Sequence, residues 1–229
     1  MSSVIASNPV SENSAQSANV YQSIKILPGL HSAIIGMTGS GKSELSKRLV
    51  VNTSRLCVID SKGEYELPGL PVYSDVRRIK RDKPDRFIYR PTAGNFSNLQ
   101  MYDELLEWVF NRPPFRVCLD ELRGIMQGKK FPHHLEVIYC MGRSRNVCCT
   151  GTFQRPSALP LFMLSEATQF YAFRLTLADD IKRVSTFVPG YSADLFQRSD
   201  VTPYTFAYKN VKDQKPLRLI ELDLSQGKK

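Results

Sequence analysis

Eight short apolar runs constrain the fold of this chain more than any other feature. They read HSAIIGM, RLCVID, RFIYR, FRVCLD, NVCCTGTF, QFYAFRLTL, PYTFAY and LRLIEL, and most are separated by stretches with helical spacing. Strands that alternate with helices predict a mostly parallel sheet covered by helices on both faces. The last two runs follow each other closely and predict an antiparallel hairpin at one edge. We therefore expect a three-layer α/β fold.

Length and composition are typical of one fairly large globular domain. The chain has 229 residues, of which 42% are hydrophobic. Residues 1–20 are rich in Ser, Asn and Ala and predict a flexible arm, so we expect the folded domain to span residues 21–229. The first residues have no basic and apolar regions of the kind that signal peptides carry, and no apolar run reaches the roughly 18 residues of a membrane helix. These features predict a cytosolic protein.

The charge balance favours a polyanionic partner. The chain carries 31 Lys and Arg against 22 Asp and Glu, a formal net charge of +9. Two basic stretches could hold the phosphates of a duplex without reading its sequence, or could equally form a solvated surface. The densest basic cluster is VRRIKRDKPDRFIYR, and a second basic stretch is a loop further along the chain. The candidate DNA contacts in these two stretches are Arg77, Arg78, Lys80, Arg81, Lys129 and Lys130.

The five cysteines favour a structural interpretation over a metal or redox site. No C-x-x-C pair occurs, and Cys57 and Cys118 lie in apolar runs where a free cysteine behaves as a small hydrophobic residue. The spacing of His133, His134 and Cys140 matches no common zinc site. Cys148 and Cys149 are adjacent on an expected strand, so their side chains should point to opposite faces of the sheet.

The segment GMTGSGKS follows the first expected strand and precedes a stretch with helical spacing. It fills the pattern G-x-x-x-x-G-K-[ST] of a P-loop, whose backbone N–H groups surround a β-phosphate at a helix N-terminus. We expect Lys42 to reach the β- and γ-phosphate oxygens and Ser43 to help hold Mg²⁺. The residues predicted to bind ATP are Gly36, Met37, Thr38, Gly39, Ser40, Gly41, Lys42 and Ser43.

A pair of acids ends the buried run FRVCLDEL. Asp120 is placed to bind Mg²⁺, and Glu121 to orient or deprotonate an attacking water. The alternative is that both acids cap a helix formed by ELRGIM. Together with the P-loop, the pair favours ATP hydrolysis over phosphoryl transfer to a small molecule.

With these motifs and the segment QRPS, the chain resembles the FtsK-HerA superfamily of DNA-pumping P-loop ATPases. VIDSKGEY, MGRSRN and AFRLTLADD are similar to further elements of that superfamily, in the same order, over roughly residues 30–185. In its small size and its lack of extra domains, the chain most resembles the genome-packaging ATPases of tailless, membrane-containing icosahedral viruses such as tectiviruses. The resemblance implies a P-loop NTPase fold of the RecA-like (ASCE) type.

The resemblance also implies roles for single residues. Gln154 matches a glutamine that contacts the γ-phosphate or the attacking water, and Arg143 matches an arginine that can act on a neighbouring subunit's nucleotide, with Arg145 as the alternative. An arginine supplied in trans implies a ring, expected to be a hexamer. Lys62 matches a lysine of the superfamily for which the sequence suggests no role.

The leading hypothesis is an ATP-driven motor that moves double-stranded DNA into a preformed viral capsid. Its expected partners are DNA, capsid or portal-vertex proteins and further copies of itself, and its expected location is the host cytoplasm and the packaging vertex of the virion. One alternative is a cellular DNA-export or conjugation-type ATPase of the same superfamily. The other is a non-motor nucleotide-binding protein, either an assembly switch or a small-molecule kinase.

Overall fold

A computed structural model of the chain describes residues 29–122, 125–197, 199 and 201–223. The predicted arm at 1–20 lies outside these residues. The strands are β1 His31–Ile35, β2 Leu56–Asp60, β3 Val72–Tyr73, β4 Arg86–Tyr89, β5 Phe115–Asp120, β6 Val147–Phe153, β7 Ala167–Phe173, β8 Thr205–Asn210 and β9 Arg218–Glu221. The α-helices are α2 Lys42–Val50, α3 Val76–Asp82, α4 Leu99–Phe110, α5 His133–Met141, α6 Leu161–Ser165 and α7 Ala178–Phe187. Single 3₁₀ turns are η1 Ala93–Asn95, η2 Gly142–Arg145, η3 Pro156–Ala158 and η4 Ala193–Phe196.

All the strands of the described residues join one sheet in the order β3-β4-β2-β5-β6-β1-β7-β8-β9. The strands from β3 to β7 in this order pair in parallel, whereas β7 with β8 and β8 with β9 pair antiparallel. The mostly parallel sheet and its antiparallel edge hairpin are therefore confirmed. The two-residue strand β3 was not predicted, because so short a strand has no apolar run of its own.

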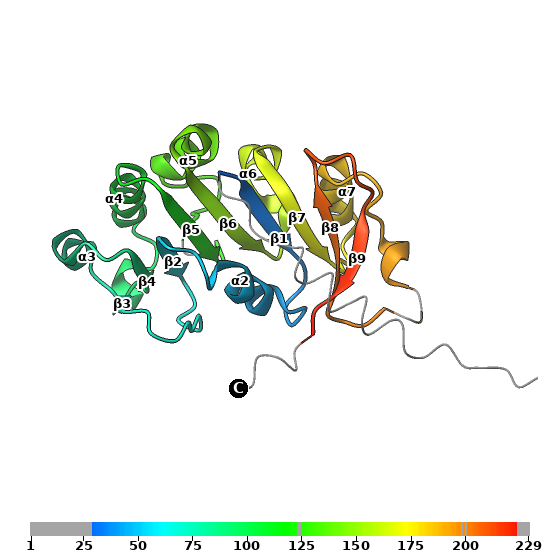
Figure 1. Cartoon of the computed structure of the whole chain (residues 1–229), viewed down its shortest axis with the longest axis horizontal. Coiled ribbons are helices and arrows are strands. Elements are labelled where there is room, and N and C mark those ends of the chain that lie inside the picture. Colours follow the sequence, from blue (N-terminus) through cyan, green and yellow to red (C-terminus); the bar gives the residue numbers. More distant parts are fainter. Residues whose placement is uncertain (1–28, 123–124, 198, 200, 224–229) are drawn as a thin grey trace, which may run out of the picture.

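Helices cover both faces of the sheet, as Figure 1 shows, with α2 on one face and α4 to α7 on the other. Neighbouring strand residues alternate between these faces. In β1, Ile35 packs in the large core cluster with α4, α5 and α7, while Ile34 packs with Leu45 of α2 on the opposite face. Both faces of the central strands are thus apolar, which explains why their sequences read as continuous apolar runs.

The cysteines are part of this core. Cys57, Cys118, Cys148 and Cys149 are buried and unbridged, and burial raises the pKa of each thiol. Cys149 packs into the large cluster, and burial keeps it protonated and unreactive. The prediction that these cysteines serve as small hydrophobic residues is confirmed.

The segment after Asp120 does not form the helix that the capping alternative for Asp120 and Glu121 requires. Leu122, Ile125 and Met126 are not in a helix, and Glu121 has a φ of 66°. The described part of ELRGIM therefore offers no helix for the two acids to cap. None of the helices in the described residues is long and apolar enough to cross a membrane.

His31 opens β1 as a buried, neutral side chain. Its Nδ1 accepts a hydrogen bond from the Cys149 backbone N–H at 3.0 Å, and its ring stacks on Tyr139 at 4.7 Å between centroids. Burial lowers the pKa of His31 to about 3, and the nearby charges of Arg116 and Arg143 act in the same direction. The folded protein therefore holds an imidazole that resists protonation.

This pKa predicts a component of acid sensitivity. Below about pH 6.5 the unfolded chain protonates His31 while the folded chain does not, so the free energy of unfolding falls as the pH drops towards 3. His31→Phe keeps the ring stacking and removes the titration. We expect the loss of stability between pH 7 and pH 5, measured by urea unfolding, to be about 2 kcal/mol smaller in this variant. An equal loss in both proteins would contradict the assignment.

Candidate functional site

The P-loop lies where β1 ends and α2 begins, at the carboxyl edge of the parallel sheet. Gly41 precedes α2 with a φ of 95°, a conformation that favours glycine. A Cβ at Gly36 would lie 2.6 Å from the Cβ of Phe173, so only glycine lets the loop pass this close to β7. Both glycines are therefore required by geometry, and together they direct the loop over the N-terminus of α2.

Lys42 lies within this loop rather than on the outer surface. It is 7% exposed, and its Nζ donates a hydrogen bond to the Met37 carbonyl at 2.6 Å. Burial lowers the pKa of Lys42 to about 8; the charge of Glu121 opposes this shift, and the neighbouring ammonium of Lys62 adds to it. Two ammonium groups thus face one site.

Asp120 ends β5 beside the first turn of α2. Its Oδ1 accepts hydrogen bonds from the Ser43 hydroxyl at 3.1 Å and the Thr152 hydroxyl at 3.2 Å. Burial raises the pKa of Asp120, and these two hydrogen bonds oppose the rise. The Ser43 hydroxyl and the Asp120 carboxylate are hard oxygen donors at one point, a set that fits Mg²⁺.

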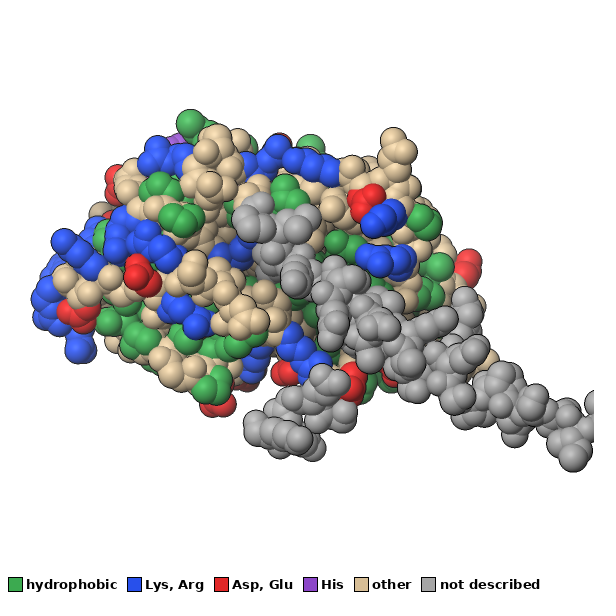
Figure 2. Space-filling model, viewed as in Figure 1, with side chains coloured by type: hydrophobic (Ala, Val, Ile, Leu, Met, Phe, Trp, Pro, Cys, Tyr) green, Lys and Arg blue, Asp and Glu red, His purple; other side chains and the backbone are tan. Residues whose placement is uncertain are grey.

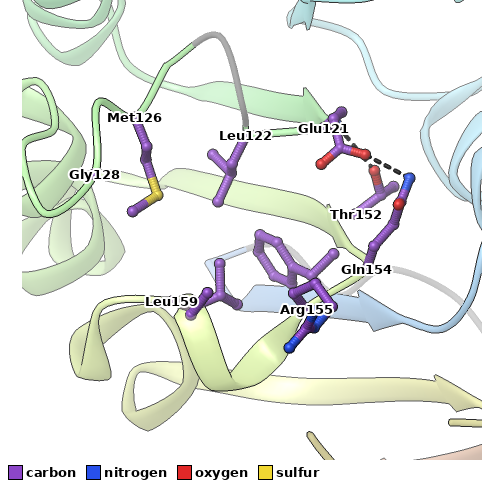
Figure 3. Close-up of a pocket in the computed structure, with 10 residues that line it drawn as sticks. Glu121, Leu122, Met126, Gly128, Thr152, Gln154, Arg155 and Leu159 are labelled. Carbon is purple, nitrogen blue, oxygen red and sulfur yellow. Dashed lines mark hydrogen bonds between the residues drawn. The ribbon is translucent and has the colours of Figure 1, made fainter. Parts of the chain in front are cut away.

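Glu121 turns towards the end of β6 and forms the centre of a polar cluster (Figure 3). Its backbone N–H donates to the Thr152 hydroxyl at 3.2 Å, and its Oε2 accepts a hydrogen bond from Gln154 Nε2 at 2.6 Å. The same Oε2 lies 3.2 Å from Lys62 Nζ. Gln154 Oε1 in turn accepts from the Thr38 hydroxyl at 3.2 Å, which connects the cluster to the P-loop.

The loop that carries Lys62 is held by a buried carboxylate. Asp60, at the end of β2, accepts hydrogen bonds from the backbone N–H groups of Gly63, Glu64 and Tyr65 at 2.8–3.2 Å. It also forms an ion pair with Arg90 at 2.9 Å, although its own side chain is fully buried. Arg90 belongs to the basic stretch of the sequence, yet its role here is to fix this loop.

A recess of about 260 Å³ opens beside Glu121 and Gln154. Its wall is largely apolar and includes Leu122, Met126 and Leu159, as Figure 3 shows. Arg155 at its rim forms an ion pair with the buried Asp180 of α7 at 2.9 Å. The segment QRPS is thereby attached to α7, and Gln154 stands on a fixed support.

The structure places Arg143 and Arg145 away from this cluster. Both lie in η2, which precedes β6, whereas Gln154 follows β6. The seven residues of β6 span about 23 Å, so the two arginines stand at the opposite edge of the sheet. The Arg145 guanidinium packs on the ring of Phe110 at 4.6 Å. Within one chain neither arginine belongs to the site.

The predicted DNA contacts lie in two segments of the chain, helix α3 and the loop that follows Met126. Figure 2 shows Lys and Arg side chains gathered at the end of the molecule where α3 lies. There Lys80 pairs with Glu104 at 3.4 Å and Arg81 with Asp82 at 2.8 Å, while Arg77 and Arg78 are exposed on the same helix. Lys129 and Lys130 are exposed in the loop that follows Met126.

Sequence reasoning missed the partners that position the predicted residues. Thr152 holds both acids, Thr38 holds Gln154, and Asp60 with Arg90 holds the Lys62 loop. Thr152 reaches this position through the strand register: β5 and β6 are neighbouring parallel strands, and Asp120 pairs with Thr152. His134 lies 3.0 Å from Asp103, and no cluster of three metal-ligating side chains occurs in the described residues.

Comparisons with known proteins agree with this geometry. Residues 10–109 match the family described as the central domain of the helicase HerA. None of the curated proteins compared with the chain matches it significantly.

Several solved structures share the fold. The genome packaging NTPase B204 of Sulfolobus turreted icosahedral virus 2, in complex with ATP-gammaS, is 15% identical with a TM-score of 0.68, over 87% of this chain and 100% of that one. B204 of Sulfolobus turreted icosahedral virus, a DNA-packaging ATPase, is 16% identical with a TM-score of 0.65, over 86% and 100%. VirB4 of Thermoanaerobacter pseudethanolicus is 10% identical with a TM-score of 0.63, over 86% and 90%.

At these identities the structural matches show the fold, and the match to the HerA central domain adds a similarity in sequence over residues 10–109. The predicted resemblance is therefore confirmed: this chain has the fold of the P-loop ATPases and resembles the FtsK-HerA superfamily, with similarity to its viral genome-packaging members.

Proposed function

We propose that this protein hydrolyses ATP and uses the energy to move double-stranded DNA, packaging a viral genome into a preformed capsid. The observation that carries the proposal is the convergence of Lys42, Asp120, Glu121 and Gln154 at one point of the carboxyl edge of the sheet. Ligands of open α/β sheets bind at this edge. The solved structures of similar fold include NTPases bound to ATP analogues, which supports the choice of nucleotide.

Each residue of the site has a task in this proposal. The P-loop, residues 36–43, surrounds the phosphates, and Lys42 neutralises their charge. Ser43 and Asp120 would hold Mg²⁺, which stabilises the charge that develops on the phosphate oxygens. Glu121 takes the proton of the attacking water as general base. Gln154 orients this water or the γ-phosphate, and its contact with Thr38 of the P-loop supports this role.

The two arginines of η2 require a second subunit in this proposal. Arg143 lies exposed at the edge of the sheet opposite the P-loop, so it reaches a nucleotide only on a neighbouring copy. Arg145 is the alternative. An arginine supplied in trans contributes about 10³- to 10⁵-fold to turnover in other NTPases. A hexameric ring would then make hydrolysis depend on assembly.

The target of the motor is proposed from charge and from the comparisons. A net charge of +9 and the basic surfaces at α3 and at Lys129 and Lys130 suit the phosphates of a duplex. A genome-packaging NTPase of similar fold matches this chain over its own full length, which supports packaging. We accordingly propose capsid or portal-vertex proteins as partners, and the host cytoplasm and the packaging vertex of the virion as the location.

Hydrolysis provides a direct test of the site. Lys42→Ala removes the phosphate-binding cation and Glu121→Gln removes the base, and each should lower ATP turnover by at least about 10²-fold. Phosphate release by the purified protein is the measurement. Exposed Lys215, in the turn between β8 and β9, offers a control: Lys215→Ala should leave turnover unchanged. Full turnover in Glu121→Gln would contradict the role of that carboxylate.

The similarity in fold to the pCW3 conjugation coupling protein TcpA supports a second candidate, a DNA-export or conjugation-type ATPase. Particle assembly separates the candidates. In a virus that carries Lys42→Ala, a packaging motor should leave empty capsids, which sedimentation and electron microscopy detect. Normally filled capsids would contradict packaging and favour export, whereas the loss of all capsids would indicate an assembly switch.

A further inference from the structure

Lys62 and Glu121 form an ion pair that fold stability does not explain. Their charged atoms lie 3.2 Å apart, and the Lys62 side chain is 40% exposed while that of Glu121 is 14% exposed. An ion pair with one exposed partner stabilises a protein little. The pair also occupies the carboxylate that the proposed function needs as a base.

The surrounding loop holds Lys62 in a defined place. Asp60 binds three consecutive backbone N–H groups directly after Lys62, and Gly63 turns the chain with a φ of 80°. Arg90 completes the anchor through the Asp60 carboxylate and the Tyr65 carbonyl. The flexible Lys62 side chain thus extends from a rigid loop, an arrangement typical of binding residues.

A second contact fixes the loop relative to the P-loop. The Tyr65 hydroxyl lies 2.8 Å from the Ser46 hydroxyl of α2, and both side chains are buried. Because α2 begins at Lys42, the position of Lys62 is set with respect to the phosphate-binding helix. The charge of the Lys62 ammonium also contributes to the lowered pKa of Lys42.

These charges define what can occupy the site between them. Lys42 and Lys62 are cations, and the facing Asp120 and Glu121 are anions. A terminal phosphate carries more negative charge than a carboxylate and presents three oxygens, so it attracts an ammonium more strongly than Glu121 does. When Lys62 turns to that phosphate, Glu121 is free to accept a proton from water.

We propose that Lys62 is a second phosphate-binding lysine, whose ammonium pairs with Glu121 in the free protein and moves to the γ-phosphate of bound ATP. The inference rests on the proposed function and adds a residue to it. Lys62 thereby couples recognition of the γ-phosphate to the release of the base. ADP, which lacks this phosphate, leaves the pair with Glu121 intact.

The test compares two nucleotides on the full-length protein. Dissociation constants for AMPPCP and for ADP, each with Mg²⁺, are measured by calorimetry for the wild type, Lys62→Met and Lys62→Arg. Loss of one charge-assisted contact to the γ-phosphate should weaken AMPPCP binding by at least about tenfold in Lys62→Met, with ADP binding changed less than about threefold. Lys62→Arg should retain part of the preference for AMPPCP, and the distant Lys215→Met should behave as the wild type.

A second variant separates direct contact from action through Glu121. In a Glu121→Gln background, Lys62→Met should still weaken AMPPCP binding by a similar factor, because the lost contact is to the phosphate. If the effect disappears there, Lys62 acts only by holding Glu121, and the proposal is wrong. Equal effects on AMPPCP and ADP, or none on either, would also overturn it.

The wild-type measurements distinguish this proposal from the function on which it rests. A wild type that binds and hydrolyses ATP while Lys62→Met treats both nucleotides alike overturns the role of Lys62 alone. A wild type that binds neither nucleotide overturns both.

Discussion

The parallel register of β5, β6 and β1 is the constraint on which the site depends. Asp120 pairs with Thr152, and Ile35 with Phe153, so the three strands end side by side. The residues that follow, which include the P-loop, Glu121 and Gln154, must then meet at one edge. The Thr152 hydroxyl donates a hydrogen bond to the Asp120 carboxylate and accepts one from the Glu121 backbone N–H, so the strand register positions both acids. A slip of one residue would turn Thr152 away from them.

Glu121 is the point at which the elements of the site are coupled. Its left-handed backbone turns it away from the direction of β5, and its carboxylate is shared by Gln154 of the β6 end and Lys62 of the β2 loop. In our proposal, the γ-phosphate of bound ATP attracts both partners away from the Glu121 carboxylate. In the proposed mechanism this arrangement connects nucleotide binding to the availability of Glu121 as a base, and the hydrogen bond from Thr38 to Gln154 brings the P-loop into the same network.

Most of the fold and the central residues of the site could be predicted from the sequence, because both depend on local patterns. Strands buried on both faces leave continuous apolar runs, and a phosphate loop needs glycines at fixed spacing, as Gly36 and Gly41 show. Contacts between distant segments could not be predicted in this way. Lys62 pairs with Glu121, and Asp60 with Arg90, because the strand order places β2 between β4 and β5. The position of Arg143 at the opposite edge from the P-loop follows from chain order, because Arg143 precedes β6 and Gln154 follows it.

The central claim is that hydrolysis at this site is coupled to DNA. The most direct measurement is steady-state ATP turnover by the wild-type protein with and without double-stranded DNA, at protein concentrations that allow a ring to assemble. We expect the duplex to raise turnover severalfold, this increase to fall as salt screens the phosphate contacts, and turnover per subunit to rise with protein concentration. Turnover that is independent of DNA at every protein concentration would contradict the account.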